Sequence, residues 1–401
     1  VRRLVGSEMC IRDSINTLEL QFRNTLRKKI YYWSPSIVNI ATNSAVINSA
    51  FSIKKYSKIF DAEIINFFGE FERFDKNIKS KEIKLINFYN KKLFNYLPRH
   101  GKINSRISFI LIFLMSFIPL KKILKQDKPE YLIVHLITSL PLILLIMFKF
   151  QTKFVLRISG LPRLNIIRKF LWKIALKKIH LITCPTQETY KYIKSLNLCD
   201  EKKIKILSDP IIYVKDVKNK LKESIDTSQD FYVAIGRLTR QKNFLFLCKC
   251  FNHLVKKNPK LNLFIIGDGE NYSLINNYIK KNNLSQNIKL LGYKENIFPY
   301  LKKSKGFILS SLWEDPGFVL IEAAFCRVPI YSSDSRPGPL EIIKDNVSGT
   351  LFKNNNETSF LKNFEIFLKN SQNKEIILNN LKYTKKFSVF NHYQKLSDYL
   401  R

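Results

Sequence analysis

The sequence predicts an α/β protein built from two doubly wound, Rossmann-like domains that face each other across a cleft. Short apolar runs alternate with stretches of helical spacing, the pattern of a parallel sheet with helices on both faces. This alternation occurs twice, once on each side of a polar stretch at 209–229. Several strands of the second half run directly into glycines, and open α/β sheets bind their ligands at such strand ends.

Length and charge limit the classes of protein to consider. The chain has 401 residues, 45% hydrophobic and 25% charged, which fits two or three packed domains and excludes a largely disordered protein. The formal net charge is +36, and residues 99–178 contain 16 Lys/Arg against 2 Asp/Glu. Such a field attracts phosphates, nucleic acid or an anionic membrane surface. The six cysteines lack zinc-site or CxxC spacing, which fits a cytoplasmic protein.

The first half predicts an N-terminal domain over 15–208. Residues 1–14 have no helical or strand period, and we interpret them as a non-native leader. Helical spacing is expected over Val38–Tyr56 and Leu164–Lys178. Apolar runs predict strands at Lys29–Trp33, Asp61–Phe68, Tyr131–His135, Phe154–Ile158 and His180–Cys184.

Two apolar runs in this half bear on whether the chain crosses a membrane. Ile107–Leu120 is too short to span a bilayer. Leu132–Phe148 has 17 residues without a charge, but it opens like a strand and contains Pro141. We therefore predict a strand, a loop and a buried helix there rather than a membrane span.

The second half predicts a C-terminal domain over 230–384, after a linker at 209–229. Helical spacing is expected over Leu245–Lys257 and Tyr272–Asn282, and a last helix over 385–401. Strands are predicted at Phe231–Ile235, Leu261–Ile266, Ile288–Leu291, Gly306–Ser311 and Pro329–Ser332.

A loop with two cations follows the first strand of the second half. Gly236 permits a tight turn at the strand end. Arg237 can bind two oxygens at once and Lys242 adds a point charge, a combination that suits a diphosphate. The alternative is a solvated basic loop in a Lys-rich protein.

Three acidic residues follow the fourth strand. Asp315 and Pro316 are interpreted as a helix cap and a proline in the first turn, and the free amides there make an anion or polyol site. Glu314 and Glu322 should lie at the same end of the sheet, where they can accept hydrogen bonds from sugar hydroxyls. For Glu314 the alternative is ordinary capping. Glu322 is flanked by apolar residues and needs a partner. A third block, 332–341 (SSDSRPGPLE), also follows a strand and opens a helix at Gly338–Glu341, where capping is again the alternative.

Together these blocks resemble glycosyltransferase family 4, a group of nucleotide-sugar-dependent enzymes with the two-domain GT-B fold. The resemblance covers about residues 230–352. It consists, in order, of GRLTRQKN, IIGDGE, LGY, the Glu314/Glu322 pair and GPLEIIKDNVSGTLF. It implies the GT-B architecture, transfer with retention of anomeric configuration, and neither a metal nor another cofactor.

The resemblance also implies roles for individual residues. Arg237 and Lys242 would hold the donor diphosphate and stabilise the leaving charge, and are catalytic together with Glu314. Glu314 and the amides of Gly317 and Phe318 would position the donor sugar.

The remaining donor-binding residues follow from the same resemblance. Glu322 would bind the nucleotide ribose, and Tyr293 would lie beside the base. Gly236 and Gly267, at two strand ends, complete the expected donor site.

The N-terminal half matches less closely, which leaves the acceptor-side catalytic residue open. The Trp33–Ser36 loop stands where many members have a glycine pair, and Ser159 stands where many have a histidine. His135 is a candidate substitute, with a core histidine as the alternative. Arg327 stands where many members of the family have a glycine. The segment 385–401 is expected to cross back to the N-terminal domain.

The expected function is sugar transfer from a nucleotide-sugar donor to a lipid-linked or polysaccharide acceptor in surface glycan synthesis (lipopolysaccharide, capsule or exopolysaccharide). The enzyme is expected in the cytoplasm, with residues 99–178 contacting the inner membrane face. One alternative is a GT-B nucleotide-sugar epimerase, which needs acid/base residues in the cleft and no acceptor. The other is a nucleic-acid-binding protein, although no aromatic stacking platform is evident.

Overall fold

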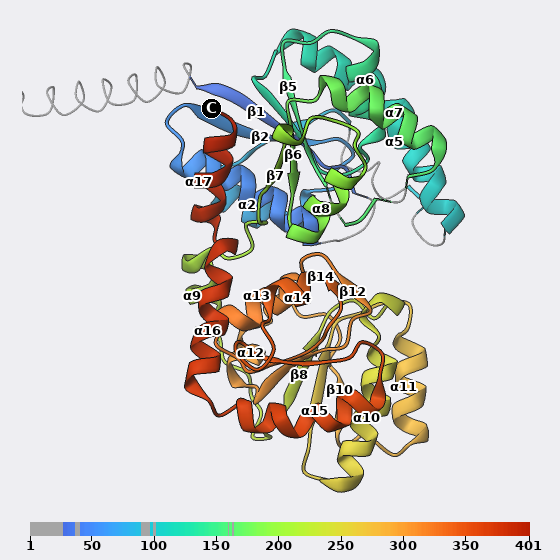
Figure 1. Ribbon diagram of the computed structural model, residues 1–401, viewed down its shortest axis with the longest axis vertical. Coiled ribbons are helices and arrows are strands. Elements are labelled where there is room, and N and C mark those ends of the chain that lie inside the picture. The colour runs from blue at the N-terminus through green and yellow to red at the C-terminus, as the bar shows by residue number, and fades with distance from the viewer. Residues whose placement is uncertain (1–26, 37–40, 90–96, 99–101, 159, 163) are drawn as a thin grey trace, which may run out of the picture.

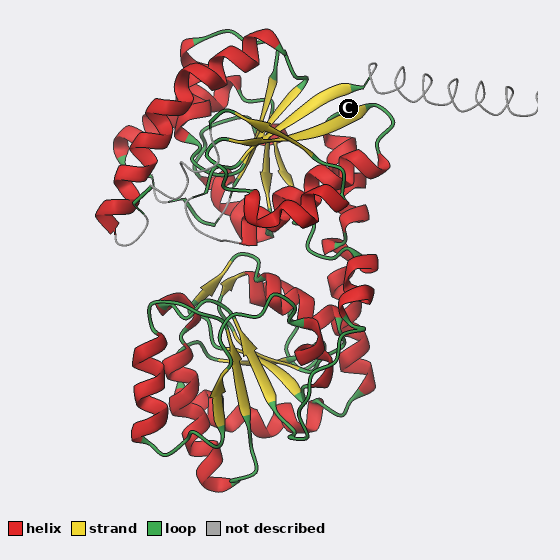
Figure 2. Cartoon of the chain, turned by 180° about the vertical axis from the view of Figure 1, so that it is seen from behind, coloured by secondary structure: helices red, strands yellow, loops and turns green. Residues whose placement is uncertain are grey.

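A computed structural model describes residues 27–36, 41–89, 97–98, 102–158, 160–162 and 164–401. It contains two α/β domains stacked end to end (Figure 1). Each domain has a central parallel sheet with helices on both sides, as Figure 2 shows from behind. The predicted α/β fold with two doubly wound domains is confirmed.

The N-terminal sheet has seven strands, all parallel, in the order β3-β2-β1-β4-β5-β6-β7. The strands are β1 (Lys28–Trp33), β2 (Phe60–Asn66), β3 (Lys84–Asn87), β4 (Tyr131–Val134), β5 (Lys153–Arg157), β6 (Leu181–Cys184) and β7 (Ile204–Ile206). The five predicted strands are present. The strands β3 and β7 escape prediction because they are short and carry lysines.

Helices cover both faces of this sheet. Those of the first half are α2 (Ala41–Tyr56), α3 (Asp75–Ser80), α5 (Lys102–Gln126), α6 (Ser139–Met147), α7 (Ile166–Lys178) and α8 (Gln187–Ser195). The helices α5 to α8 share one hydrophobic core with one face of the sheet. Side chains of α2 and α3 contribute to the core on the other face. The predicted strand, loop and buried helix over Leu132–Phe148 are confirmed by β4 and α6.

The prediction that the apolar run at Ile107–Leu120 is too short to span a bilayer is wrong, because the helix that contains this run is longer than the run itself. The helix α5 extends this run at both ends to 25 residues. Among the described residues it is the one helix long and apolar enough to cross a membrane, over Arg106–Gln126, with a mean hydropathy of 2.1. The extension was missed because lysines and an asparagine flank the apolar run.

The C-terminal sheet has six parallel strands in the order β10-β9-β8-β11-β13-β15. They are β8 (Tyr232–Ile235), β9 (Leu263–Ile266), β10 (Ile288–Leu290), β11 (Gly306–Leu309), β13 (Ile330–Ser333) and β15 (Thr350–Phe352). A separate two-stranded sheet pairs β12 (Trp313–Glu314) with β14 (Arg336–Pro337). This small sheet brings the Glu314 loop beside the loop that precedes Gly338.

The helices of the second half are α9 (Val214–Lys220), α10 (Phe244–Lys257), α11 (Tyr272–Lys281), α12 (Phe298–Lys303), α13 (Phe318–Phe325), α14 (Gly338–Ile342), α15 (Glu357–Asn370), α16 (Lys374–Thr384) and α17 (Val389–Tyr399). A 3-10 turn, η3 (Arg240–Lys242), precedes α10. On one face of the sheet Tyr331 is surrounded by aromatic rings of α15, with Phe367 stacked at 5.1 Å between ring centroids.

The last helix, α17, lies against the N-terminal domain (Figure 1). Its His392 bridges the Ser49 hydroxyl of α2 and the Ser208 carbonyl, each at 2.8 Å. The hydroxyl of Tyr131 donates to the Leu400 carbonyl at 2.5 Å. The chain therefore connects the two domains on one flank, through α9 going out and α16 and α17 coming back.

Candidate donor-binding site

Three glycine-bearing loops meet at the carboxyl ends of β8, β9 and β10. The amide of Gly236 donates to the Ile266 carbonyl at 2.9 Å, and the amide of Gly267 donates to the Gly292 carbonyl at 2.8 Å. A Cβ atom on Gly267 would lie 1.9 Å from the Gly236 carbonyl oxygen. Glycine is therefore required at 267, because no side chain fits between these backbones.

Lys242 and Glu314 form an ion pair at the centre of this sheet edge. Lys242 Nζ lies 2.5 Å from Glu314 Oε1, with the two side chains only 14% and 7% exposed. The Ser311 hydroxyl donates to the same carboxylate oxygen at 2.6 Å, and Ser310 donates to the Lys242 carbonyl at 2.9 Å. The loops after β8 and β11 are thus held together, and two charged groups from separate sequence blocks become neighbours.

Arg237 lies on the same loop as Lys242, but its side chain is exposed. Within the part of the chain that the structure describes, no carboxylate forms an ion pair with it. Two cations thus stand at one strand end, one paired with Glu314 and one open to solvent. Such an arrangement can accept a doubly charged phosphate group, because Arg supplies a fork of donors and Lys a point charge.

The helix α13 begins at this edge with free backbone amides. Its N-cap is Gly317, in the left-handed region at φ +101°, and Phe318 is the first helical residue. The prediction that Asp315 caps this helix is wrong, since α13 has no side-chain cap hydrogen bond. The loop bends through the glycine instead, so the first amides of the helix are not occupied by a carboxylate.

Glu322 lies one turn inside α13 and is half-buried between apolar residues. Burial raises the pKa of its carboxyl to about 7, and the charge of Lys220 lowers it by a smaller amount. Among the described residues no side chain or backbone group forms a hydrogen bond with this carboxyl. The described part of the chain therefore does not supply the partner that a carboxyl in these apolar surroundings needs.

Tyr293 occupies the loop after β10, at the far side of the glycine cluster. Its side chain is 66% exposed. Its ring is available to a ligand that occupies the edge of the sheet. The structure thus gathers Gly236, Arg237, Lys242, Gly267 and Tyr293 at the carboxyl ends of β8 to β10, and the block of β11 and α13 lies next to them.

Two carboxylates of the C-terminal domain reach across to the N-terminal domain, a role that the sequence does not predict for either. Asp315 Oδ2 accepts the Gly160 amide at 2.7 Å and lies 3.4 Å from the Thr189 hydroxyl. The Glu341 carboxylate accepts the amides of Gln187 at 2.8 Å and Glu188 at 2.7 Å. Glu341 thus caps the N-terminus of α8, where the helix dipole favours a negative charge.

The environment of Asp315 is unusual for a carboxyl group. Its Oδ1 atom is buried and has no hydrogen-bond partner in the described residues. Burial raises the pKa of Asp315 to about 6, against a lowering by the charge of Arg157. Sequence reasoning missed this contact because Asp before Pro is also the usual signature of a helix start.

On the N-terminal side of the cleft, buried charges lie at the ends of β4 and β5. Arg157 is paired with Asp209, and both side chains are almost fully buried. His135 lies near Arg157 and His392, and burial holds its pKa well below the ordinary range. His135 is therefore a neutral side chain inside the domain. Ser159, the other candidate at this edge, lies outside the described residues.

The Trp33–Ser36 loop follows β1 and is buried. The Ser34 hydroxyl has no partner in the described part of the chain, and the Ser36 hydroxyl accepts a hydrogen bond from Asn43 at 3.0 Å.

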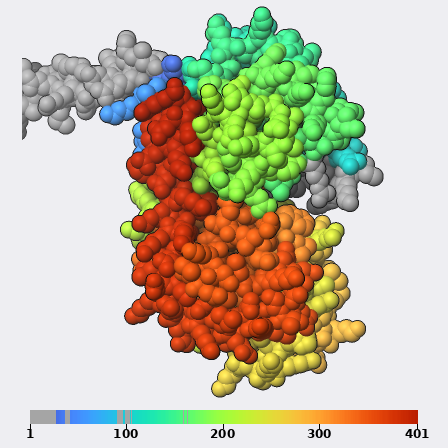
Figure 3. Space-filling view, viewed as in Figure 1, coloured from blue at the N-terminus to red at the C-terminus, as the bar shows by residue number. Residues whose placement is uncertain are grey.

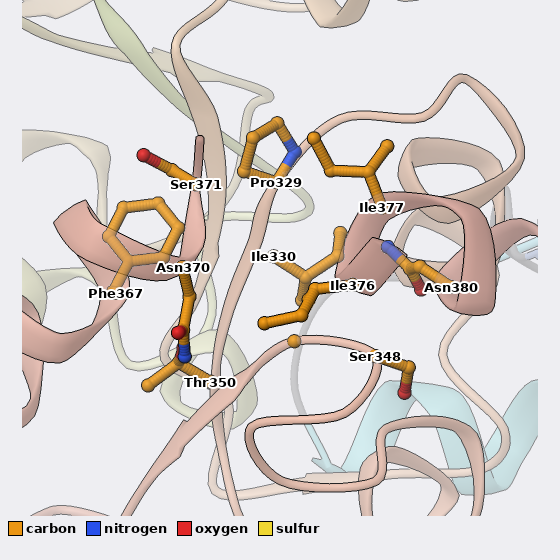
Figure 4. A pocket seen from close by; sticks show the side chains of 11 residues that line it. Pro329, Ile330, Ser348, Thr350, Phe367, Asn370, Ser371, Ile376, Ile377 and Asn380 are labelled. Atoms are coloured by element: carbon orange, nitrogen blue, oxygen red, sulfur yellow. The ribbon is translucent and has the colours of Figure 1, made fainter. Parts of the chain in front are cut away.

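A small cavity of the C-terminal domain, of about 10 Å³, lies between β13, α15 and α16 (Figure 4). It is lined mostly by apolar groups at the amino end of β13, away from the glycine cluster, and is large enough for about one water molecule.

The C-terminal half of the chain is similar to a known protein family. Residues 216–384 match the family model described as "Glycosyl transferases group 1". The chain is 33% identical over 313 residues to the "Uncharacterized glycosyltransferase MJ1059" of Methanocaldococcus jannaschii, and the aligned region covers 73% of each protein. It is 28% identical over 297 residues to the Escherichia coli "UDP-Gal:alpha-D-GlcNAc-diphosphoundecaprenol alpha-1,3-galactosyltransferase", covering 65% of this chain and 74% of the relative.

A solved structure of a glycosyltransferase from Rickettsia africae superimposes on 93% of this chain and 98% of its own, with a TM-score of 0.71 at 15% identity. That likeness shows the fold, which is GT-B, and the sequence relatives show the family. The resemblance inferred from the motifs is confirmed at the level of the group 1 glycosyltransferases: the chain belongs to this family and is a nucleotide-sugar-dependent transferase.

Proposed function

We propose that the protein transfers a sugar, with retention of anomeric configuration, from a nucleoside-diphosphate sugar to a lipid-linked or polysaccharide acceptor in surface glycan assembly. The observation that carries the proposal is the meeting of two cations and two carboxylates at one edge of the C-terminal sheet. Arg237 and Lys242 match a diphosphate, and Glu314 and Glu322 match the hydroxyls on its two sides. No metal or other cofactor is required by this arrangement of charges.

The cations act on the leaving group. During transfer the bond between the sugar and the diphosphate breaks, and negative charge develops on the diphosphate. Lys242 stabilises this charge from a largely buried position, where electrostatic interactions are stronger than in water, and Arg237 adds a second cation from the exposed part of the same loop. Lys242 exchanges part of its contact with Glu314 for the phosphate, and the carboxylate is then available to a sugar hydroxyl.

The carboxyl of Glu322 and the start of α13 hold the rest of the donor. With a pKa of about 7, the half-buried Glu322 lacks a partner and gains hydrogen bonds when a ribose supplies hydroxyl groups. The amides of Gly317 and Phe318 are donors for sugar oxygens. Tyr293 offers an exposed ring to the base. These roles account for the residues on the C-terminal side of the cleft.

The acceptor is proposed from a relative. The Escherichia coli protein named above acts, by its name, on a sugar attached to diphosphoundecaprenol. An acceptor of this class would enter from the N-terminal side, between β4, β5 and α8. There the amide of Gly160 and the N-terminus of α8 are now occupied by Asp315 and Glu341. Opening of the cleft would release both groups for an acceptor diphosphate.

The test is release of nucleoside diphosphate from a panel of UDP-, GDP-, ADP- and dTDP-sugars, with and without an undecaprenyl-diphosphate sugar. Wild type is compared with Arg237→Ala, Glu322→Ala and, as a matched surface control, Lys281→Ala. Acceptor-dependent release from one donor, lost in the first two variants only, supports the proposal. No release from any donor, or equal activity of all variants, contradicts it.

The same assay separates the proposal from an epimerase. An isomer of the donor sugar that appears without acceptor would indicate an epimerase of the same fold. The anomeric configuration of the product, read from its proton NMR spectrum, decides between retention and inversion.

A further inference from the structure

The helix α5 exposes apolar side chains on a face where a surface helix ordinarily carries polar ones. Ser108 and Ser116 point into the domain and are fully buried. The Ser108 hydroxyl donates to the Pro98 carbonyl at 2.6 Å, whereas the Ser116 hydroxyl has no partner in the described residues. The outward face is apolar instead: Leu114 is 64% exposed and Ile118 is 73% exposed. A helix in water places its polar residues outside and its apolar residues inside.

A second helix on the same flank also exposes apolar side chains. The first turns of α7 expose Ile166, Ile167 and Phe170, with Ile166 at 89%. The helix α6 packs between α5 and α7, and all three lie on the flank of the N-terminal domain opposite α17 (Figure 1). We call this surface the apolar flank. It consists of Ile107, Phe109, Ile110, Leu111, Leu114, Ile118, Ile166, Ile167 and Phe170.

The helices that carry most of the apolar flank are positively charged. The helices α5 and α7 together contain ten Lys/Arg and no Asp or Glu. Arg106, Arg168 and Lys169 are exposed in the turns that carry the apolar side chains. Exposed apolar groups interleaved with cations match the interface of an anionic bilayer, in which hydrocarbon lies beneath negatively charged headgroups.

The flank also lies on the side of the N-terminal domain away from the helices that connect the two domains. Both α5 and α7 extend from the distal end of the domain down toward the C-terminal domain, and α7 begins shortly after the carboxyl end of β5 (Figures 1 and 3). The linker α9 and the helices α16 and α17 lie on the opposite flank. A membrane bound to the apolar flank would therefore approach the two domains from the side that these connecting helices leave free.

We propose that the apolar flank docks the enzyme on an anionic phospholipid bilayer, with α5 lying in the plane of the interface. This inference rests on the proposed lipid-linked acceptor and names the surface on which that acceptor would be met. The helix lies on the membrane rather than across it, because Ile112 and Leu120 on its other face are buried in the core of the domain. A second copy of the chain is a poorer occupant, since two identical surfaces with ten cations each repel one another.

The test is flotation of the full chain with vesicles of phosphatidylethanolamine and phosphatidylglycerol, compared with phosphatidylcholine alone. The flank variant is Leu114→Gln, Ile118→Gln, Ile166→Gln and Ile167→Gln combined. The charge variant is Lys169→Gln with Lys173→Gln. The matched control is Leu274→Gln with Lys280→Gln and Lys281→Gln, which changes exposed residues of the same types on α11.

We expect the wild type and the control to float with the anionic vesicles, and the flank variant to bind at least about tenfold more weakly. The charge variant should lose its preference for anionic over neutral vesicles. Binding of the flank variant equal to that of wild type, or no binding by wild type, overturns the proposal. So does a wild type that sediments as a dimer while the flank variant is a monomer, because the flank would then be a contact between copies.

A measurement without vesicles keeps this test separate from the test of the proposed function. Thermal shift by UDP and by the other nucleoside diphosphates, without vesicles, reports the donor site alone. Unchanged shifts together with lost flotation assign the defect to membrane docking. Normal flotation of a wild type that no nucleotide shifts would contradict the proposed function and leave the docking surface in place.

Discussion

Lys242 Nζ and Glu314 Oε1 lie 2.5 Å apart, although 72 positions separate the two residues in the sequence. The pair joins the loop after β8 to the loop after β11, and both side chains are largely excluded from water. It is therefore a structural contact between the two loops, and in the proposed function it also supplies charge to the reaction. These two roles make separate predictions.

Replacing Lys242 by Met should lower turnover far more than a surface substitution does. Loss of one preorganised group that stabilises a developing negative charge typically costs about 10²–10³-fold in kcat. Initial rates with the preferred donor measure the effect, and Lys281→Met is the matched control. A fall of kcat no larger than that of the control would show that Lys242 does not contact the leaving group.

The same ion pair should couple the stability effects of its two partners. Lys242→Met leaves the buried Glu314 with Ser311 as its remaining partner, and should cost about 1–3 kcal/mol of unfolding free energy. Adding Glu314→Gln should restore part of this loss, because the unpaired charge is then removed. Urea unfolding of both single variants and the double variant gives the coupling. Simple additivity would contradict a direct interaction.

Glu341 should hold the cleft closed. Glu341→Ala removes an anion from the N-terminus of α8 together with two hydrogen bonds, and hydrogen bonds to a charged group contribute about 1.5–3 kcal/mol each. We expect a larger radius of gyration in small-angle X-ray scattering without ligand. Glu295→Ala, at an exposed loop position, is the control. An unchanged scattering curve would mean that other contacts keep the two domains together.

Asp315 should make stability depend on pH between about 4 and 6. Because burial raises its pKa in the folded state to about 6, the folded protein holds this proton more tightly than the unfolded chain. Protonated Asp315 therefore adds up to about 3 kcal/mol to the free energy of unfolding at low pH. This contribution is lost as the pH rises through 6.

The measurement is the unfolding free energy from urea titrations at several pH values between 4 and 7. The difference between wild type and Asp315→Asn should change over this window, since the variant lacks the titrating group. Other carboxyls with raised pKa values, such as Glu70 and Glu322, are common to both proteins and cancel in the difference. A constant difference across the window would refute the shift.

Gly267 should tolerate no side chain. A Cβ atom there would approach the Gly236 carbonyl to 1.9 Å, so Gly267→Ala forces two loops apart and should cost about 3 kcal/mol or more. Gly292→Ala is the matched control, because a Cβ there meets nothing within 4 Å and φ is +66°. That control should cost only about 1–2 kcal/mol, from the left-handed backbone alone. Melting temperatures of the two variants give the comparison, and equal losses would contradict the steric account.

Much of the C-terminal domain could be predicted because its signals are local. The strands at Phe231–Ile235 and Leu261–Ile266 are apolar runs that end in glycine, and the structure places β8 and β9 there with small shifts of their ends. The grouping of Arg237, Lys242, Glu314 and Glu322 also follows from local order, because the carboxyl ends of parallel strands meet at one edge. Short or polar elements such as β3, β7 and α9 were missed, since a few half-exposed residues carry no clear period.

The sequence by itself determined that two doubly wound halves form and which residues stand at the ends of the C-terminal strands, because apolar period and glycine position act within a few residues. Only the tertiary structure decided that Asp315 and Glu341 bond to the opposite domain, where a helix cap had been expected. It also decided that α5 turns Ser108 and Ser116 inward and leaves Leu114 and Ile118 exposed. The physical reason is the same in both cases: hydrogen bonds and burial depend on which surfaces meet, and no local pattern specifies that meeting.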